Sequence, residues 1–78
     1  MVPEAVVARV LGMSRSAVTD ATSNANVAAW DSLNHVSLIL ELETTYGVSF
    51  SAEETLSMTD VAAIKRVLRS HGASWEGA

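Results

Sequence analysis

The segment from residue 32 to residue 46 constrains the fold more than any other part of this chain. On a helical wheel with ~100° between successive residues, its apolar side chains cover roughly 220° of the circumference. A surface helix needs an apolar arc of only a little more than about 100° to face its core. Gly47 follows the segment, and a glycine in the left-handed conformation commonly ends a helix. The pattern therefore predicts a helix over residues 32–46 with apolar contacts on more than one side.

Two stripes make up this wide apolar surface. The first consists of Leu38, Ile39, Leu42 and Tyr46, and the second of Leu33, Val36 and Leu40. Either other helices of a small bundle cover both stripes, or the second stripe faces outward and binds partner proteins. Polar side chains, among them Glu43, flank the second stripe, and a polar rim around apolar anchors is typical of transient interfaces. The residues leave both alternatives open.

A first helix and a long polar loop are predicted before this segment. Proline suits the first turn of a helix, and Pro3 precedes valines at helical spacing, so we expect a helix over about residues 3–12. Residues 13–31 are rich in Ser, Thr, Asn, Asp and Ala, which predicts a loop. Loops longer than roughly 12–15 residues are uncommon in compact domains unless they are functional or disordered. This loop ends at Ser32, which favours a functional role for the junction.

A short third helix and a last helix are predicted after it. Ser51 and Glu54 match a capping box, in which each of the two side chains accepts a hydrogen bond from a backbone amide at the helix start. The third helix should cover about residues 52–57. We expect Thr59 to cap the last helix, which ends just before Gly72.

These elements predict an all-α fold, an up-down four-helix bundle with a short third helix and a long first loop. A chain of 78 residues holds one domain, here residues 1–72, and we expect residues 73–78 to form a flexible tail. Aromatic residues make up only 5% of the chain, so the core must be mainly aliphatic. The expected core consists of Val7, Val10, Leu11, Val18, Leu38, Leu42, Phe50, Ile64 and Leu68.

Charge and cysteine content argue against several classes of function. A net charge of −4 with only five basic residues disfavours binding to nucleic acid. The chain has no cysteine, which rules out disulfides and cysteine-based metal sites, and we expect no bound metal. No apolar stretch approaches the ~20 residues of a membrane span, and no secretion signal begins the chain. We therefore expect a monomeric cytoplasmic protein that binds neither nucleic acid nor membranes.

Three roles compete for Ser32. It can cap the helix that it precedes, which serine commonly does before an apolar run. It could be a hydrolase nucleophile with His35 as its base, but the Gly-x-Ser-x-Gly elbow is absent and a chain this short leaves little room for a substrate pocket. It can also be a point of covalent attachment, because a helix N-terminus favours a phosphate. We expect His35 chiefly to pack near Trp30.

The residues around Ser32 resemble those of the acyl carrier protein family. Asp31-Ser32-Leu33, followed by an apolar helix that ends in the run ETTYGV at residues 43–48, is similar to the attachment motif of that family. The resemblance extends to Val18-Thr19 before the motif. It also extends to residues 51–61, which are similar to the short third helix and the start of the fourth. Most of the chain can thus be placed on the family pattern.

This resemblance implies an acyl-carrier-type bundle in which Ser32 carries a 4'-phosphopantetheine arm, transferred from coenzyme A by a phosphopantetheinyl transferase. The thiol of the arm would hold acyl or aminoacyl groups as thioesters for loading enzymes and downstream synthases or transferases, and the carrier itself would be no enzyme. The partner-recognition residues that it implies are Asp31, Leu33, Val36, Leu40 and Glu43. The alternative is an unmodified helical interaction module that binds a partner through the second stripe.

Departures from the family pattern favour a specialised pathway. Fatty-acid carriers usually have a glycine shortly before Asp-Ser-Leu, where this chain has Ala28-Ala29-Trp30. The Gly-Gly-x-Ser signature of peptidyl carriers is also missing. Trp-Asp-Ser-Leu with His35 three residues after the serine resembles discrete carriers of specialised pathways. We therefore expect a specialised biosynthetic role in preference to housekeeping fatty-acid synthesis.

Overall fold

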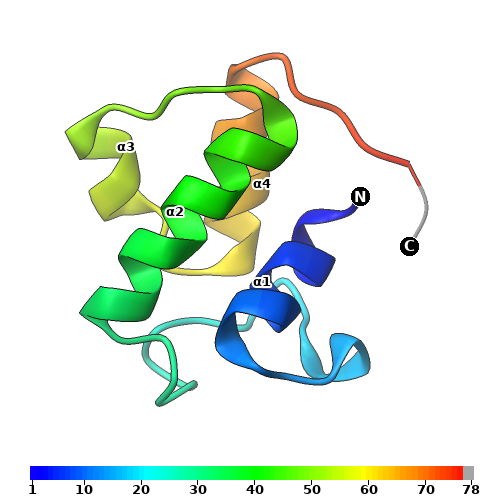
Figure 1. Cartoon of the computed structure of the whole chain (residues 1–78), viewed down its shortest axis with the longest axis vertical. Coiled ribbons are helices and arrows are strands. Elements are labelled where there is room, and N and C mark those ends of the chain that lie inside the picture. Colours follow the sequence, from blue (N-terminus) through cyan, green and yellow to red (C-terminus); the bar gives the residue numbers. More distant parts are fainter. Residues whose placement is uncertain (77–78) are drawn as a thin grey trace.

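A computed structural model describes residues 1–76 of the chain, and it is all-α, as the sequence predicts (Figure 1). Its elements are α1 (Pro3–Leu11), the 3-10 turn η1 (Arg15–Ala17), α2 (Ser32–Tyr46), α3 (Ala52–Ser57) and α4 (Val61–Ser70). No β-strand forms within the described residues. Across the same residues, no helix combines the length and the apolar character needed to cross a membrane.

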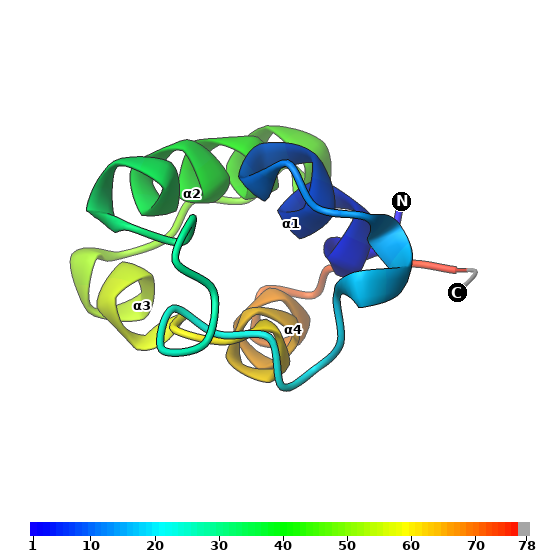
Figure 2. The same ribbon diagram turned by 90° about the horizontal axis from the view of Figure 1, so that it is seen from below.

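The four helices surround one common centre (Figure 2). In Figure 1, α2 and α4 run in the same general direction and α1 runs the opposite way. α1 packs against both α2 and α4, and α3 stands to one side of α2. α2 therefore has α1 on one flank and α3 on the other.

The centre is filled by aliphatic side chains, with one tryptophan and one methionine. Most of the expected core residues are buried, but Val10 and Phe50 are only partly buried and pack against the edge of the core. Trp30 and Met58 are buried although the sequence analysis did not place them in the core. The side chains of the core are those of Val6, Val7, Ala8, Leu11, Val18, Trp30, Leu38, Ile39, Leu42, Met58, Val61, Ile64 and Leu68.

Side chains cap α3 and α4 at their N-termini. The predicted capping box is confirmed, since Ser51 N donates to Glu54 Oε1 at 2.9 Å and Glu54 N donates to Ser51 Oγ at 3.1 Å. The expectation that Thr59 caps α4 is wrong, because Asp60 is the cap and its Oδ1 accepts from Ala63 N at 2.7 Å. Thr59 would have to bond the amide three residues on, at Ala62, and that amide already donates to a carbonyl of the long loop.

The predicted loop over residues 13–31 is tied to the start of α4. Asn24 N donates to Thr59 O at 3.0 Å, and Val61 N donates to Thr22 O at 3.0 Å. Thr22 is buried, and the loop also contributes two apolar side chains to the core. The loop crosses one end of the bundle (Figure 2) and leads the chain into α2 along a defined path.

The chain after α4 packs against the core beyond residue 72, where we expected a flexible tail from the sequence. Ala73 and Trp75, in the segment expected to be a flexible tail, lie against the core. The Trp75 ring meets the Tyr46 ring edge-to-face with centroids 6.0 Å apart, and the Arg69 guanidinium lies 4.8 Å from its centroid. Residues 77–78 of the expected tail lie outside the described residues.

A charged cluster joins α1, the long loop and α4. Lys65 Nζ lies 2.6 Å from Glu4 Oε2 and 2.6 Å from Asp20 Oδ1, and the Lys65 and Glu4 side chains are largely buried. Burial alone would raise the pKa of Glu4, but hydrogen bonds from Lys65 and from the backbone, together with the charges of Lys65 and Arg15, outweigh it and hold that pKa below its ordinary value of 4.5. The bonds to Asp20 and Glu4 raise the pKa of Lys65. The cluster therefore favours the charged form of both Glu4 and Lys65.

We predict that Lys65→Met lowers the free energy of unfolding by about 1–2 kcal/mol at neutral pH, because it leaves the largely buried Glu4 carboxylate unpaired. Urea unfolding monitored by circular dichroism measures this change. Since the pKa of Glu4 is lowered, the stabilisation is present above pH 4.5 and is lost as the pH falls through the lowered pKa. The difference between wild type and Lys65→Met should therefore shrink in acid.

The matched control is Arg66→Met, which removes an exposed cation from the same helix. It should change the free energy of unfolding by less than about 0.5 kcal/mol. Equal losses in the two variants would show that the cluster does not stabilise the fold.

Candidate functional site

Ser32 lies at the first residue of α2, and its hydroxyl is not needed to start the helix. Asp31 is the N-cap, and its Oδ1 accepts from Asn34 N at 2.9 Å. The interpretation of Ser32 as the cap is therefore wrong, because the residue before it already fills that role. Ser32 is exposed, and within residues 1–76 its hydroxyl makes no hydrogen bond. Its side chain is free to react.

The start of α2 also leaves backbone donors open. Among the described residues, the N–H groups of Ser32 and Leu33 have no hydrogen-bond acceptor. These groups lie at the positive end of the helix dipole, where an anion is stabilised. An oxyanion attached to Ser32 would be close to both.

The buried side chain of Trp30 anchors the end of the long loop, directly before α2. Its side chain is buried in the core, two residues before Ser32. Its backbone N–H donates to Val27 O at 3.0 Å, and Asn34 Nδ2 donates to Ala29 O at 2.7 Å. The chain on both sides of Ser32 is thus fixed, while the serine hydroxyl remains free.

His35 packs on Trp30, as the sequence predicts. The two rings lie 6.3 Å apart with an angle of 23° between their planes, and Trp30 Nε1 donates to His35 Nδ1 at 2.9 Å. His35 Nε2 lies 2.8 Å from Thr55 O. Because the indole can only donate, Nδ1 is the acceptor and Nε2 carries the proton. Both ring nitrogens are engaged, so in this geometry His35 is not available as a base for Ser32.

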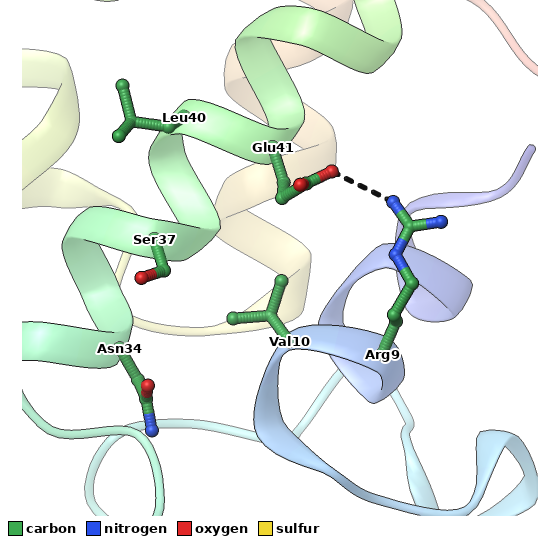
Figure 3. A pocket seen from close by; sticks show the side chains of 6 residues that line it. All are labelled: Arg9, Val10, Asn34, Ser37, Leu40 and Glu41. Atoms are coloured by element: carbon green, nitrogen blue, oxygen red, sulfur yellow. Dashed lines mark hydrogen bonds and ion pairs between the residues drawn. The ribbon is translucent and has the colours of Figure 1, made fainter.

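A hollow of about 460 Å³ lies on the α1 side of α2, and we call it the α1–α2 groove (Figure 3). Asn34, Ser37, Leu40 and Glu41 line it from successive turns of α2, and Arg9 and Val10 line it from α1. Arg9 Nη2 reaches Glu41 Oε2 at 2.9 Å across it, in a pair that is about half exposed. Ser32 does not line this groove.

A second hollow, of about 430 Å³, opens beside Ser32 between α2, α3 and the long loop. We call it the Ser32 cleft. It is lined by Asn24, Trp30, Asp31, Ser32, His35, Val36, Thr55, Leu56 and Thr59. Its walls combine apolar side chains with several hydroxyl and amide groups. A group joined to the Ser32 hydroxyl can therefore enter the cleft directly.

The second apolar stripe of α2 faces outward. Leu33 is 76% exposed, Val36 56% and Leu40 58%, so no other described part of the chain covers them. Leu56 on α3 is 77% exposed and was missed by the sequence analysis, although it is the one large apolar residue of an otherwise polar short helix. Val36 and Leu56 stand on opposite sides of the Ser32 cleft, so the exposed apolar surface continues across it.

Glu43 differs from the other residues that the resemblance implies for partner recognition. Its Oε2 accepts from Phe50 N at 2.8 Å, and the residue is partly buried. Its carboxylate therefore holds the chain that leaves α2 after Gly47. The structure brings Asp31, Ser32 and Val36 together at the cleft and places Glu43 near the far end of the helix.

No protein-family model matches this chain, and a search of curated proteins finds no match. Within the described part of the chain, no three or more His, Asp or Glu side chains come together as a metal site would require. What the site can do therefore follows from its own residues.

We predict that Asp31→Ala lowers the free energy of unfolding by about 0.5–2 kcal/mol, since it removes the N-cap of α2. Ser32→Ala should change it by less than about 0.5 kcal/mol, because the hydroxyl bonds nothing in the folded chain. Urea unfolding of the two variants measures both changes. A Ser32→Ala loss as large as that of Asp31→Ala would contradict this assignment of the cap.

Proposed function

We propose that this protein is an acyl carrier protein whose Ser32 bears a 4'-phosphopantetheine arm. The observation that carries the proposal is an exposed serine hydroxyl that has no structural task and opens onto a cleft. Asp31 already caps α2, so capping does not explain the serine at position 32. The sequence around Ser32 resembles the attachment motif of this family.

The residues at the start of α2 fit a phosphodiester on Ser32. The open N–H groups of Ser32 and Leu33 can donate to phosphate oxygens, and the helix dipole favours negative charge there. Asn24, Thr55 and Thr59 line the cleft and can hydrogen-bond to amide groups of the arm. When bound, the arm supplies the thiol that this cysteine-free chain lacks.

The exposed stripe on α2 fits successive partner enzymes. Leu33 and Asp31 are close to the hydroxyl that a transferase must reach, and we assign them to recognition by the phosphopantetheinyl transferase. Val36 and Leu40 extend the same surface and are assigned to enzymes that load or use the cargo. The carrier itself catalyses no step, and it raises the local concentration of a tethered substrate at each partner. A role in a specialised biosynthetic pathway and an acyl-carrier-type bundle belong to the same proposal.

We predict that incubation with coenzyme A and a broad-specificity phosphopantetheinyl transferase adds one phosphopantetheinyl group to the protein. Intact mass spectrometry measures the gain. Ser32→Ala should show none, and Ser37→Ala, which removes an exposed serine from the same helix, should be modified like wild type. Modification of Ser32→Ala, or no modification of folded wild type by several transferases, would refute the proposal.

We further predict that Leu33→Glu lowers kcat/KM of the transferase about tenfold or more, because an apolar anchor that becomes buried at the centre of an interface can contribute ~1.4 kcal/mol or more, and ~1.4 kcal/mol corresponds to a factor of ten. Initial rates at several carrier concentrations measure this value. Arg66→Glu, an exposed charge change on α4, is the matched control and should have a smaller effect.

The second candidate function is an unmodified interaction module, and the exposure of Leu33, Val36 and Leu40 is the observation that favours it. Such a module would bind one partner through the second stripe of α2. Ser32→Ala would then leave binding intact, whereas Leu40→Glu would abolish it. A carrier would respond in the opposite way to Ser32→Ala, since it would lose all function.

A further inference from the structure

α3 depends on the rest of the chain for its position. None of its own side chains is buried, and six residues are too few for a helix to be stable alone. Met58, directly after the helix, is fully buried, and Phe50, directly before its cap, is partly buried. These two side chains anchor the ends of α3, so the helix between them relies on hydrogen bonds to other elements.

Both histidines of the chain make such bonds. His35 Nε2, on α2, donates to Thr55 O at 2.8 Å. His71 Nε2, at the end of α4, donates to Glu54 Oε2 at 2.9 Å. Within residues 1–76, no other hydrogen bond links residues 52–57 to a distant part of the chain. α3 is therefore held on two sides by the one kind of side chain that ordinarily gains a proton between pH 8 and pH 5.

The bond from His35 requires a neutral ring. Its Nδ1 accepts from Trp30 Nε1 at 2.9 Å, so this nitrogen carries no proton. A proton on Nδ1 would set two donors against each other, and Trp30 is buried and cannot turn to water. Because the imidazole is rigid, a ring that turns Nδ1 away from the indole also draws Nε2 away from Thr55 O. Protonation of His35 thus breaks its bond to α3.

The bond from His71 persists when its ring is protonated. Neutral and protonated imidazole can both donate from Nε2, and a protonated ring adds charge attraction to Glu54. A backbone hydrogen bond from Ser51, together with the bond from His71, outweighs burial and keeps the pKa of Glu54 below its ordinary value of 4.5. Glu54 is therefore mostly ionised at about pH 5, and this side of α3 stays held.

Few charged groups face His35. Asp31 is the one other titratable residue that lines the Ser32 cleft with it. The Glu54 carboxylate, on α3, is bonded to the cap of its own helix and to the other histidine. The long loop and the link to α4 contribute Asn24, Trp30 and Thr59, which carry no charge. Asp31 is thus the charge that attracts a proton to His35, and Trp30 is the group that opposes it.

We propose that α3 is a pH-sensitive wall of the Ser32 cleft, docked on α2 while His35 is neutral and released on that side when His35 gains a proton. Release frees Thr55 and Leu56, which line the cleft, while His71 still holds the outer side of the helix. Acid therefore changes the surroundings of Ser32 without unfolding the bundle. This inference goes beyond the proposed function, because neither histidine needs an arm on Ser32.

Three variants separate the two histidines. His35→Gln keeps an acceptor for Trp30 and a donor for Thr55 in a side chain that does not titrate. His35→Leu removes both bonds at every pH. His71→Gln keeps a donor for Glu54 and removes only the titration on the outer side of α3.

The first measurement records the nitrogen-15 shifts of the histidine rings by NMR, on the unmodified protein at about pH 7.5. The spectrum of His35→Gln assigns the two rings. His35 should carry its proton on Nε2 and none on Nδ1. A proton on Nδ1 at this pH would overturn the proposal, because the ring could not then accept from Trp30.

The second measurement compares hydrogen-exchange protection at about pH 7.5 and about pH 5, after correction for intrinsic exchange rates. In wild type, protection of the α3 amides and of the Trp30 indole N–H, assigned with Trp75→Phe, should fall roughly 2- to 10-fold in acid relative to α1 and α4. This is the fall expected for the loss of one hydrogen bond. His71→Gln should show the same fall. His35→Gln should be protected at both pH values and His35→Leu at neither.

No fall in wild type, an equal fall in all helices, or a fall that persists in His35→Gln and His35→Leu would overturn the proposal. The two His35 variants decide this whether or not glutamine restores full protection, because neither side chain titrates. All samples are unmodified, so the result does not depend on whether Ser32 accepts an arm.

Discussion

The arrangement around Ser32 depends on the buried indole of Trp30. A tryptophan in the core brings a large apolar surface and one N–H group that needs an acceptor. His35 is that acceptor, and its other nitrogen reaches the Thr55 carbonyl on α3. One buried side chain thus connects the end of the long loop, the first turn of α2 and the wall of the cleft.

The same region leaves Ser32 without any structural role. Asp31 caps α2, Asn34 bonds back to the loop, and His35 holds α3, so the neighbours of the serine provide the local stability. A hydroxyl in such a position can be modified without loss of the fold. This separation between a free attachment point and a rigid surrounding is what a carrier requires, and it supports the function that we propose.

The hydrogen bonds that side chains make near the helix ends were predicted only in part, and the wrong predictions have a common cause. The Ser51–Glu54 box was found because both partners are local and three residues apart. Thr59 and Asp60 are both good caps, and the choice between them depended on a loop carbonyl from a distant part of the chain. Glu43 likewise has the charged side chain expected on an exposed helix face, yet its carboxylate accepts a hydrogen bond from the backbone amide of Phe50, beyond the end of α2.

The sequence by itself determined the all-α class, the approximate extents of the four helices and the position of Ser32 at the start of an apolar helix, because hydrophobic periodicity, glycine stops and local caps act within a few residues. Only the tertiary structure decided which apolar stripe of α2 is covered, which groups line the Ser32 cleft, and that both nitrogens of His35 are engaged. These features depend on contacts between residues far apart in the chain. Trp30 and Thr55 meet His35 only when the loop, α2 and α3 come together.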